Sequence, residues 1–224
     1  MFQGYSNETF EFFMAIRFNN NRAFFQENRD WYLRAVREPS LVLAQDLNAL
    51  IEEIDPDMER RPHRALSRIN RDVRFSKDKS PYRDHVWMAF RRPSADRGGM
   101  PGLYFQLEAE GGEYGMGFYH ENREILDALR ARIAQRPDEM LALLADLSKD
   151  YQLYVDQRVR LTIPEGLPDA LIPIYRARSL YLFRRIEDFD LIKSPELVQA
   201  LAAGYRRLAP LYRYIMSFCP ETGL

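Results

Sequence analysis

The sequence has few of the features that mark disulfide-bonded, zinc-binding, secreted or membrane-spanning proteins. Cys219 is the only cysteine in 224 residues, which excludes an intrachain disulfide and a zinc site built from cysteines. No apolar run approaches the roughly 20 residues that span a bilayer. The first ten residues, MFQGYSNETF, lack the basic and then apolar regions of a secretory signal. We therefore expect a cytoplasmic protein with no membrane partner.

Motifs for common cofactors and reactions are also scarce. Gly115-Met116-Gly117 lacks the third glycine of a dinucleotide fingerprint. The chain contains no phosphate-binding loop that ends in Gly-Lys-Ser/Thr and no Gly-x-Ser-x-Gly nucleophile motif. The histidines, at positions 63, 85 and 120, are too far apart in sequence for their spacing to support a metal site. We expect no metal and no cofactor, and whether the protein is an enzyme stays open.

The net charge of −1 and the isoelectric point of about 6.4 disfavour a nucleic-acid partner, because dedicated duplex-DNA binders usually carry a basic total. The charge is nevertheless uneven. Residues 1–59 hold 11 acids and 5 bases, a balance of −6, whereas residues 60–83 hold nine bases against Asp72 and Asp78, a balance of +7. Any preference for anions must therefore be local.

The hydrophobic content of 46% and the aromatic content of 13% indicate a globular chain. Three- and four-residue spacing predicts helices in the first 55 residues, one of them at 40–54 after Pro39 and another capped by an asparagine of 19–21. Strands are predicted at 86–91, 103–108, 114–120, 151–163 and 180–185, with a tight turn at Gly111-Gly112. Further helices are predicted at 125–133, 140–147 and 169–176, and a long one from Ser194 towards Phe218. We predict one α+β domain over 1–224, with an antiparallel or mixed sheet and the N- and C-terminal helices packed against it.

The most unusual stretch is the basic segment Arg68–His85. It holds two of the four lysines, and arginine and lysine bind carboxylates and phosphates through charge-assisted hydrogen bonds. His85 is the candidate acid or base, because histidine titrates nearest neutral pH. The candidate ligand-binding residues are Arg68, Arg71, Arg74, Lys77, Lys79 and Tyr82.

This segment has more than one interpretation. It forms either a site for a small anionic ligand or an internal network in which Asp72, Asp78 and Asp84 neutralise the arginines. A protein-interaction module built on the aromatic helices is a further alternative. Single-stranded nucleic-acid binding, with bases stacked on Phe75, Tyr82 and Trp87, is the third. Glu108 and Glu110 would share a strand face, and we favour a solvated edge there over a catalytic pair.

The sequence Arg-Asp-Val-Arg-Phe-Ser-Lys-Asp-Lys-Ser-Pro-Tyr-Arg-Asp-His at 71–85 closely resembles the signature of the domain-of-unknown-function 2461 family, a family of uncharacterised bacterial and fungal proteins. The asparagine-rich block at 18–29, Gly117-Phe118-Tyr119 and Arg178-Ser179-Leu180 also resemble that family. Its Leu-Lys-Arg-x-Pro element reads Leu161-Thr162-Ile163-Pro164 here, without the charges. The resemblance implies one α+β domain and no established activity.

Overall fold

A computed structural model describes residues 1–94, 98–157 and 161–219. The helices of the first part are α1 (Asn7–Phe18), α2 (Arg22–Glu27), α3 (Arg29–Tyr32), the π-helical η1 (Leu33–Arg37), α4 (Glu38–Ile54) and α5 (Pro62–Ala65). The later helices are α6 (Arg123–Gln135), α7 (Pro137–Leu147), the 3₁₀-helix η2 (Asp169–Leu171), α8 (Ile172–Tyr175), α9 (Phe189–Ile192) and α10 (Glu196–Met216). The strands are β1 (His85–Arg91), β2 (Gly102–Glu108), β3 (Gly111–Phe118), β4 (Gln152–Gln157) and β5 (Ala177–Ile186).

The strands form one antiparallel sheet in the order β1-β2-β3-β5-β4. The first three are consecutive in the chain and neighbours in the sheet, so they form a meander. Strand β4 pairs with β5, with Tyr154 opposite Tyr181. The predicted α+β class is therefore confirmed. No helix among the described residues is long and apolar enough to cross a membrane.

Contacts along the chain divide it into two compact units. Unit 1 comprises Met1–Phe90, Tyr104–Tyr114 and Arg185–Ala203, and unit 2 comprises Arg91–Leu103, Gly115–Arg184 and Gly204–Leu224. Each unit combines segments that are distant in the sequence, and no Gly/Ser-rich or Pro-rich linker separates them. The single domain over 1–224 stays a prediction.

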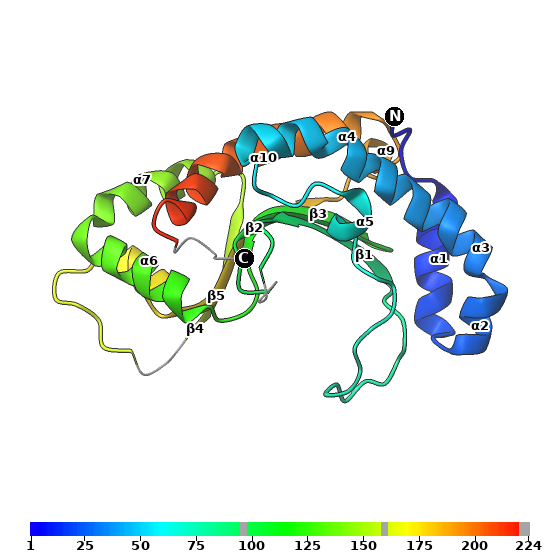
Figure 1. Ribbon diagram of the computed structural model, residues 1–224, viewed down its shortest axis with the longest axis horizontal. Coiled ribbons are helices and arrows are strands. Elements are labelled where there is room, and N and C mark those ends of the chain that lie inside the picture. Colours follow the sequence, from blue (N-terminus) through cyan, green and yellow to red (C-terminus); the bar gives the residue numbers. More distant parts are fainter. Residues whose placement is uncertain (95–97, 158–160, 220–224) are drawn as a thin grey trace. The chain divides into compact units, whose positions relative to one another are not determined.

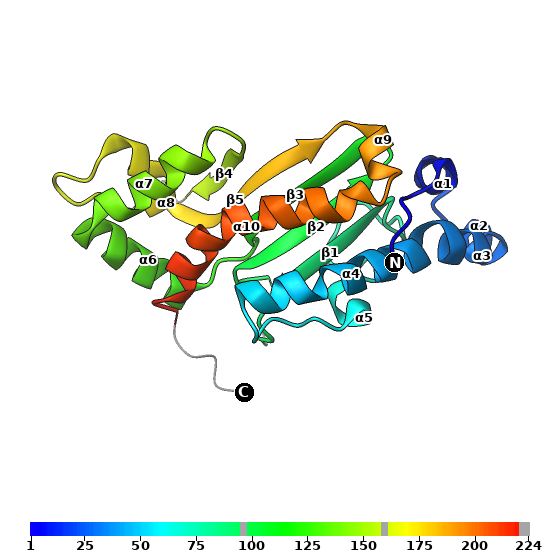
Figure 2. The same ribbon diagram turned by 90° about the horizontal axis from the view of Figure 1, so that it is seen from above.

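In unit 1, helix α4 lies over one face of strands β1 and β2 (Figures 1 and 2). Val86, Met88 and Phe90 share one face of β1, because successive strand residues point to opposite faces, and all three are buried. The apolar face of α4 contributes buried residues at three- and four-residue spacing: Leu43, Leu47, Leu50, Ile51 and Ile54. This packing fixes the strand from which the basic segment departs.

In unit 2, a buried arginine joins helix α6 to the start of β5. Arg130 donates from Nε to the carbonyl of Tyr175 at 2.9 Å and from Nη2 to that of Ala177 at 2.8 Å, while Nη1 binds Asp127 at 2.7 Å. These bonds satisfy the guanidinium of a residue that is only 9% exposed. Unit 2 is thus held by polar contacts as well as by its apolar core.

Several predicted boundaries were wrong. The helix predicted at 40–54 starts at Glu38 and continues the helical stretch from Arg29, although Pro39 does occupy its first turn and Asn21 does cap α2. Strand β3 begins at Gly111, so the turn lies at 109–110 and Gly111 opens the strand with φ 133°. Of the strand predicted at 151–163, β4 covers Gln152–Gln157, and residues 161–163 lie in no strand. Residues 158–160 lie outside the described part.

Candidate anion-binding site

The basic arm, residues 68–84, leaves the body of unit 1 between α5 and β1 (Figure 1). Its two sides pair only near their base. Asn70 and Tyr82 form an isolated antiparallel bridge, Arg71 N donates to the carbonyl of Pro81 at 2.9 Å, and Arg83 N donates to that of Ile69 at 2.8 Å. Proline offers no N–H, which limits the ladder at this point. The arm is therefore a hairpin-like loop.

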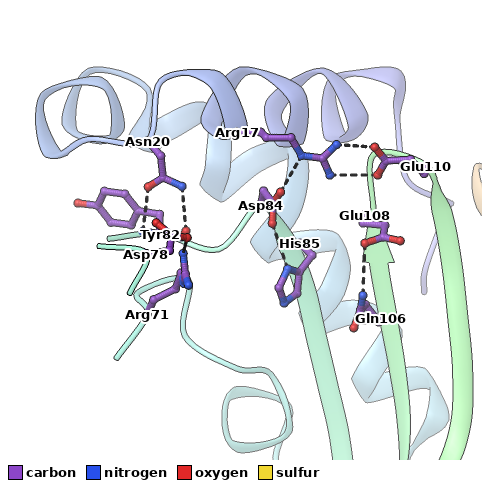
Figure 3. A network of polar contacts seen from close by, with 10 residues as sticks. All are labelled: Arg17, Asn20, Arg71, Asp78, Tyr82, Asp84, His85, Gln106, Glu108 and Glu110. Atoms are coloured by element: carbon purple, nitrogen blue, oxygen red, sulfur yellow. Dashed lines mark hydrogen bonds and ion pairs between the residues drawn. The ribbon is translucent and has the colours of Figure 1, made fainter. Parts of the chain in front are cut away.

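Tyr82 anchors the base of the arm. Its ring stacks on Phe25 with centroids 4.3 Å apart, and the residue is 7% exposed. The side-chain amide of Asn20 binds the backbone of Tyr82 twice: Nδ2 donates to the carbonyl at 2.9 Å, and Tyr82 N donates to Oδ1 at 3.0 Å (Figure 3). The structure places this candidate ligand-binding residue in the packed wall between the arm and α2.

The arm ends in an ion network centred on Arg17 (Figure 3). Arg17 Nε donates to Asp84 Oδ2 at 2.7 Å, and its two Nη atoms bind the carboxylate of Glu110. His85 Nδ1 lies 3.2 Å from the other oxygen of Asp84. Burial alone would raise the pKa of Asp84, but the hydrogen bonds from Arg17 and His85 outweigh burial, and the pKa is lowered. His85, the candidate acid or base, is thus held by a carboxylate that Arg17 keeps ionised.

The two glutamates expected to share a strand face have different partners. Glu110 lies in the turn before β3 and binds Arg17. Glu108 ends β2, where Arg185 Nη2 lies 3.7 Å from one of its oxygens and Gln106 Nε2 lies 3.4 Å from the other (Figure 3). Each glutamate has its own cationic neighbour.

Two arginines of the arm pair with the arm's own aspartates. Arg71 forms an ion pair with Asp78, and Arg74 Nη2 binds Asp72 at 2.6 Å. The guanidinium of Arg74 lowers the pKa of the Asp72 carboxyl to about 2, and Arg71 holds the pKa of Asp78 well below its usual range. These contacts match the internal network that the sequence left open as the alternative interpretation.

The lysines of the arm lie on its surface. Lys79 Nζ donates to the carbonyl of Val73 at 2.9 Å, which folds its side chain back along the arm. Lys77 is exposed. Neither lysine lines the hollow described next.

Arg68 lies elsewhere, in a hollow of about 260 Å³ that we call the cationic pocket. Three other basic residues line the same hollow: Arg29 from α3, Arg37 from the end of η1 and His63 from α5. Its apolar and neutral walls are Phe25, Tyr32, Leu33, Leu66, Ser67, Ile69 and Asn70. No aspartate or glutamate is among these lining residues.

The electrostatics of the cationic pocket differ from those of the arm. Among the ion pairs of residues 1–94, 98–157 and 161–219, none includes Arg29, Arg37 or Arg68. Burial raises the pKa of the Tyr32 hydroxyl, and the positive charge of Arg37 partly opposes that rise. Arg37 therefore acts electrostatically on the pocket wall while no carboxylate of the described chain neutralises it.

Sequence reasoning found Arg68 but missed Arg29, Arg37 and His63. The local charge excess pointed to residues 60–83, which include His63 and Arg68. Arg29 and Arg37 lie in the acidic N-terminal part, and no linear spacing connects them to Arg68. Packing of α3 and η1 against the start of the arm brings them together.

A family of known proteins matches almost the whole chain. Residues 8–214 match a family described as conserved hypothetical proteins. The chain belongs to the domain-of-unknown-function 2461 family. No curated protein matches the chain. In this member of the family the matched region includes both the cationic pocket and the basic arm, and the family description names no activity for either.

Proposed function

We propose that this member of the domain-of-unknown-function 2461 family binds a small anionic ligand, bearing a phosphate or carboxylate group, in the cationic pocket. One observation carries the proposal: Arg29, Arg37, Arg68 and His63 converge on one hollow that no acidic residue lines. Arg29 and Arg37 come from one continuous helical stretch of unit 1, and Arg68 comes from the start of the basic arm.

The chemistry of the lining favours an anion of more than one charge. A guanidinium binds two oxygens of a phosphate or carboxylate through parallel hydrogen bonds, and several guanidiniums can share one dianion. Phe25, Tyr32 and Leu33 provide apolar contacts for an organic group attached to it. A volume of about 260 Å³ is just below the usual range for ligand sites, about 300–1,000 Å³, and suits a small metabolite.

The contrast with the arm supports this location. Arg71 and Arg74 already bind Asp78 and Asp72, so an exogenous anion would have to displace a carboxylate there. Arg68 binds no carboxylate of the described chain and lies among other cations. Like charges gathered at one hollow repel each other, and a bound anion would relieve that repulsion.

Two of the aromatic rings expected to stack nucleic-acid bases are engaged within the protein. Tyr82 stacks on Phe25, and Trp87 stacks on Tyr104 with centroids 4.6 Å apart. Base stacking needs accessible ring faces in a row. This arrangement favours a small ligand over a nucleic-acid strand.

Thermal unfolding in the presence of inorganic phosphate, a sugar phosphate and a dicarboxylate tests the proposal. A ligand at 100 times its Kd stabilises the folded state by about 2.7 kcal/mol, which corresponds to a Tm increase of about 5–10 °C for a chain of this size. Arg37→Ala and Arg68→Ala should reduce the increase several-fold. Arg34→Ala removes an exposed arginine that pairs with Glu8 and should leave the increase unchanged.

Two results would reject the proposal. One is a panel in which none of the three anions raises Tm at millimolar concentration. The other is an increase of equal size in Arg68→Ala and in Arg34→Ala, because the ligand would then bind away from the cationic pocket.

A further inference from the structure

The two most exposed aromatic side chains of the described residues both belong to unit 1. Phe75, in the outer part of the basic arm, is 96% exposed, and Phe18, the last residue of α1, is 76% exposed. The outer end of the arm and the turn between α1 and α2 reach the same end of unit 1, the lower end in Figure 1. We call these two projections the aromatic tips.

Basic residues surround the aromatic tips. The outer arm, residues 71–80, holds four bases (Arg71, Arg74, Lys77 and Lys79) and two acids (Asp72 and Asp78), a balance of +2. Arg22, the exposed first residue of α2, adds a charge beside the other tip. The residues between Phe18 and Arg22 are three asparagines, so no carboxylate lies in that turn.

The form of the aromatic tips favours a flat partner. Burying a phenylalanine side chain stabilises a complex, but a protein partner would need a matching hollow for each of two separate projections. A lipid surface needs none, because aromatic rings enter its headgroup region and lysines bind its phosphates. The guanidinium of Arg74 lies 5.8 Å from the centroid of the Phe75 ring and is paired with Asp72, so the positive excess of the outer arm comes from Lys77 and Lys79.

We propose that the aromatic tips form a contact site for an anionic lipid surface. Phe75 and Phe18 enter the headgroup region, and Lys77, Lys79 and Arg22 bind lipid phosphates, for which Lys79 gives up its hydrogen bond to the carbonyl of Val73. The site is separate from the cationic pocket, which neither Phe18 nor the outer arm lines. The expectation of no membrane partner was based on the lack of a long apolar run. That argument concerns crossing a bilayer and does not bear on contact with its surface.

Co-sedimentation of the full chain with vesicles tests the proposal. Vesicles of phosphatidylcholine alone are compared with vesicles containing 30% phosphatidylserine, each at low and at high salt. The full chain should bind the anionic vesicles, and binding should weaken as salt screens the charges. Lys77→Ala/Lys79→Ala should weaken binding about 30-fold, at about 1 kcal/mol for each lysine.

The other two lysines of the chain provide a matched control. Lys149→Ala/Lys193→Ala removes the same charge elsewhere and should bind like the unchanged protein. Phe75→Ala should weaken binding about tenfold, because part of the ring's burial is lost. Tyr154→Ala removes an exposed aromatic residue of unit 2 and should have no effect.

Three results would overturn the proposal. They are no sedimentation with anionic vesicles, equal binding of the two double-lysine variants, and binding of a single-stranded oligonucleotide without binding to vesicles. Phosphate-dependent thermal stabilisation, which reports on the cationic pocket, is independent of all three.

Discussion

The network centred on Arg17 should be the main polar contribution to the stability of unit 1. Arg17 joins the last turn of α1 to Asp84, which precedes β1, and to Glu110 in the turn between β2 and β3. Arg17→Met removes the guanidinium and keeps most of the aliphatic stem. The change therefore tests the ion pairs with little loss of packing.

The two ion pairs of Arg17, with Asp84 and with Glu110, should contribute unequally to the free energy of unfolding. The side chains of Arg17 and Asp84 are 32% and 34% exposed, and a hydrogen bond between charged groups contributes about 1.5–3 kcal/mol at such a site. Glu110 is 52% exposed, and exposed pairs contribute about 0–1 kcal/mol. We expect Arg17→Met to lower the free energy of unfolding by about 2 kcal/mol and Tm by about 4–8 °C.

Urea unfolding followed by circular dichroism at low salt provides the measurement, because guanidinium chloride would screen the ion pairs. A double-mutant cycle of Arg17→Met with Asp84→Asn should give a coupling of about 1–2 kcal/mol, and the cycle with Glu110→Gln a smaller one. Arg34→Met, at an exposed pair with Glu8, should change stability by less than about 0.5 kcal/mol.

The loss of stability caused by Arg17→Met should also depend on pH. The pKa values of Asp84 and Glu110 are lowered in the folded protein. Their contribution is therefore present above the ordinary carboxyl pKa, about 4, and is lost as the pH falls through the lowered values. The difference between the unchanged protein and Arg17→Met should shrink below about pH 4. Strictly additive single-mutant effects, or a difference that grows on acidification, would refute this reasoning.

Two further predictions concern the sheet. Gly117→Ala should lower the free energy of unfolding in urea by about 2–3 kcal/mol. The new Cβ would lie 2.3 Å from the carbonyl oxygen of Leu180 and 2.4 Å from the Cβ of Tyr181. A change below about 0.5 kcal/mol would contradict the close approach of β3 and β5. Burial raises the pKa of Glu113, partly opposed by the hydrogen bond from Tyr104, so its stabilising contribution is present at low pH and is lost as the pH rises through the raised value. Glu113→Gln should consequently gain stability relative to the unchanged protein between pH 4 and pH 7, and a pH-independent difference would contradict the prediction.

The elements that sequence analysis located well are those with local signals. The side chain of Asn21 caps α2 by accepting from Phe24 N at 3.0 Å, as expected of an asparagine before an apolar helix. Pro39 lies in the first turn of α4, where a missing N–H does no harm. Boundaries set by a partner strand were placed badly. Residues 161–163 were predicted as strand but lie in none, and their own sequence does not record whether a partner strand lies beside them.

The candidate site shows the same division between local and distant information. Charge density along the chain was enough to single out the basic arm, and with it Arg68. It left pairing within the arm as one of two open interpretations, and it did not indicate that Arg68, unlike Arg71 and Arg74, lines a hollow with residues some 30–40 positions earlier. Tyr82 was ambiguous for a related reason, since its role is set by Asn20, which is 62 residues away.

The π-helical segment η1 determines the spacing of the cationic pocket. A π-helical turn contains one residue more than an α-helical turn, so it changes the direction in which the residues before it point relative to those after it. Arg29 precedes η1 and Arg37 ends it, yet both line the same hollow. The angle between Arg29 and Arg37 about the helix axis thus depends on the wider turn of the five-residue segment η1. A one-residue deletion there, with a return to regular α-helical turns, would place the two arginines seven positions apart and so still on one face of the helix. The wider turn of η1 is what lets a spacing of eight positions do the same.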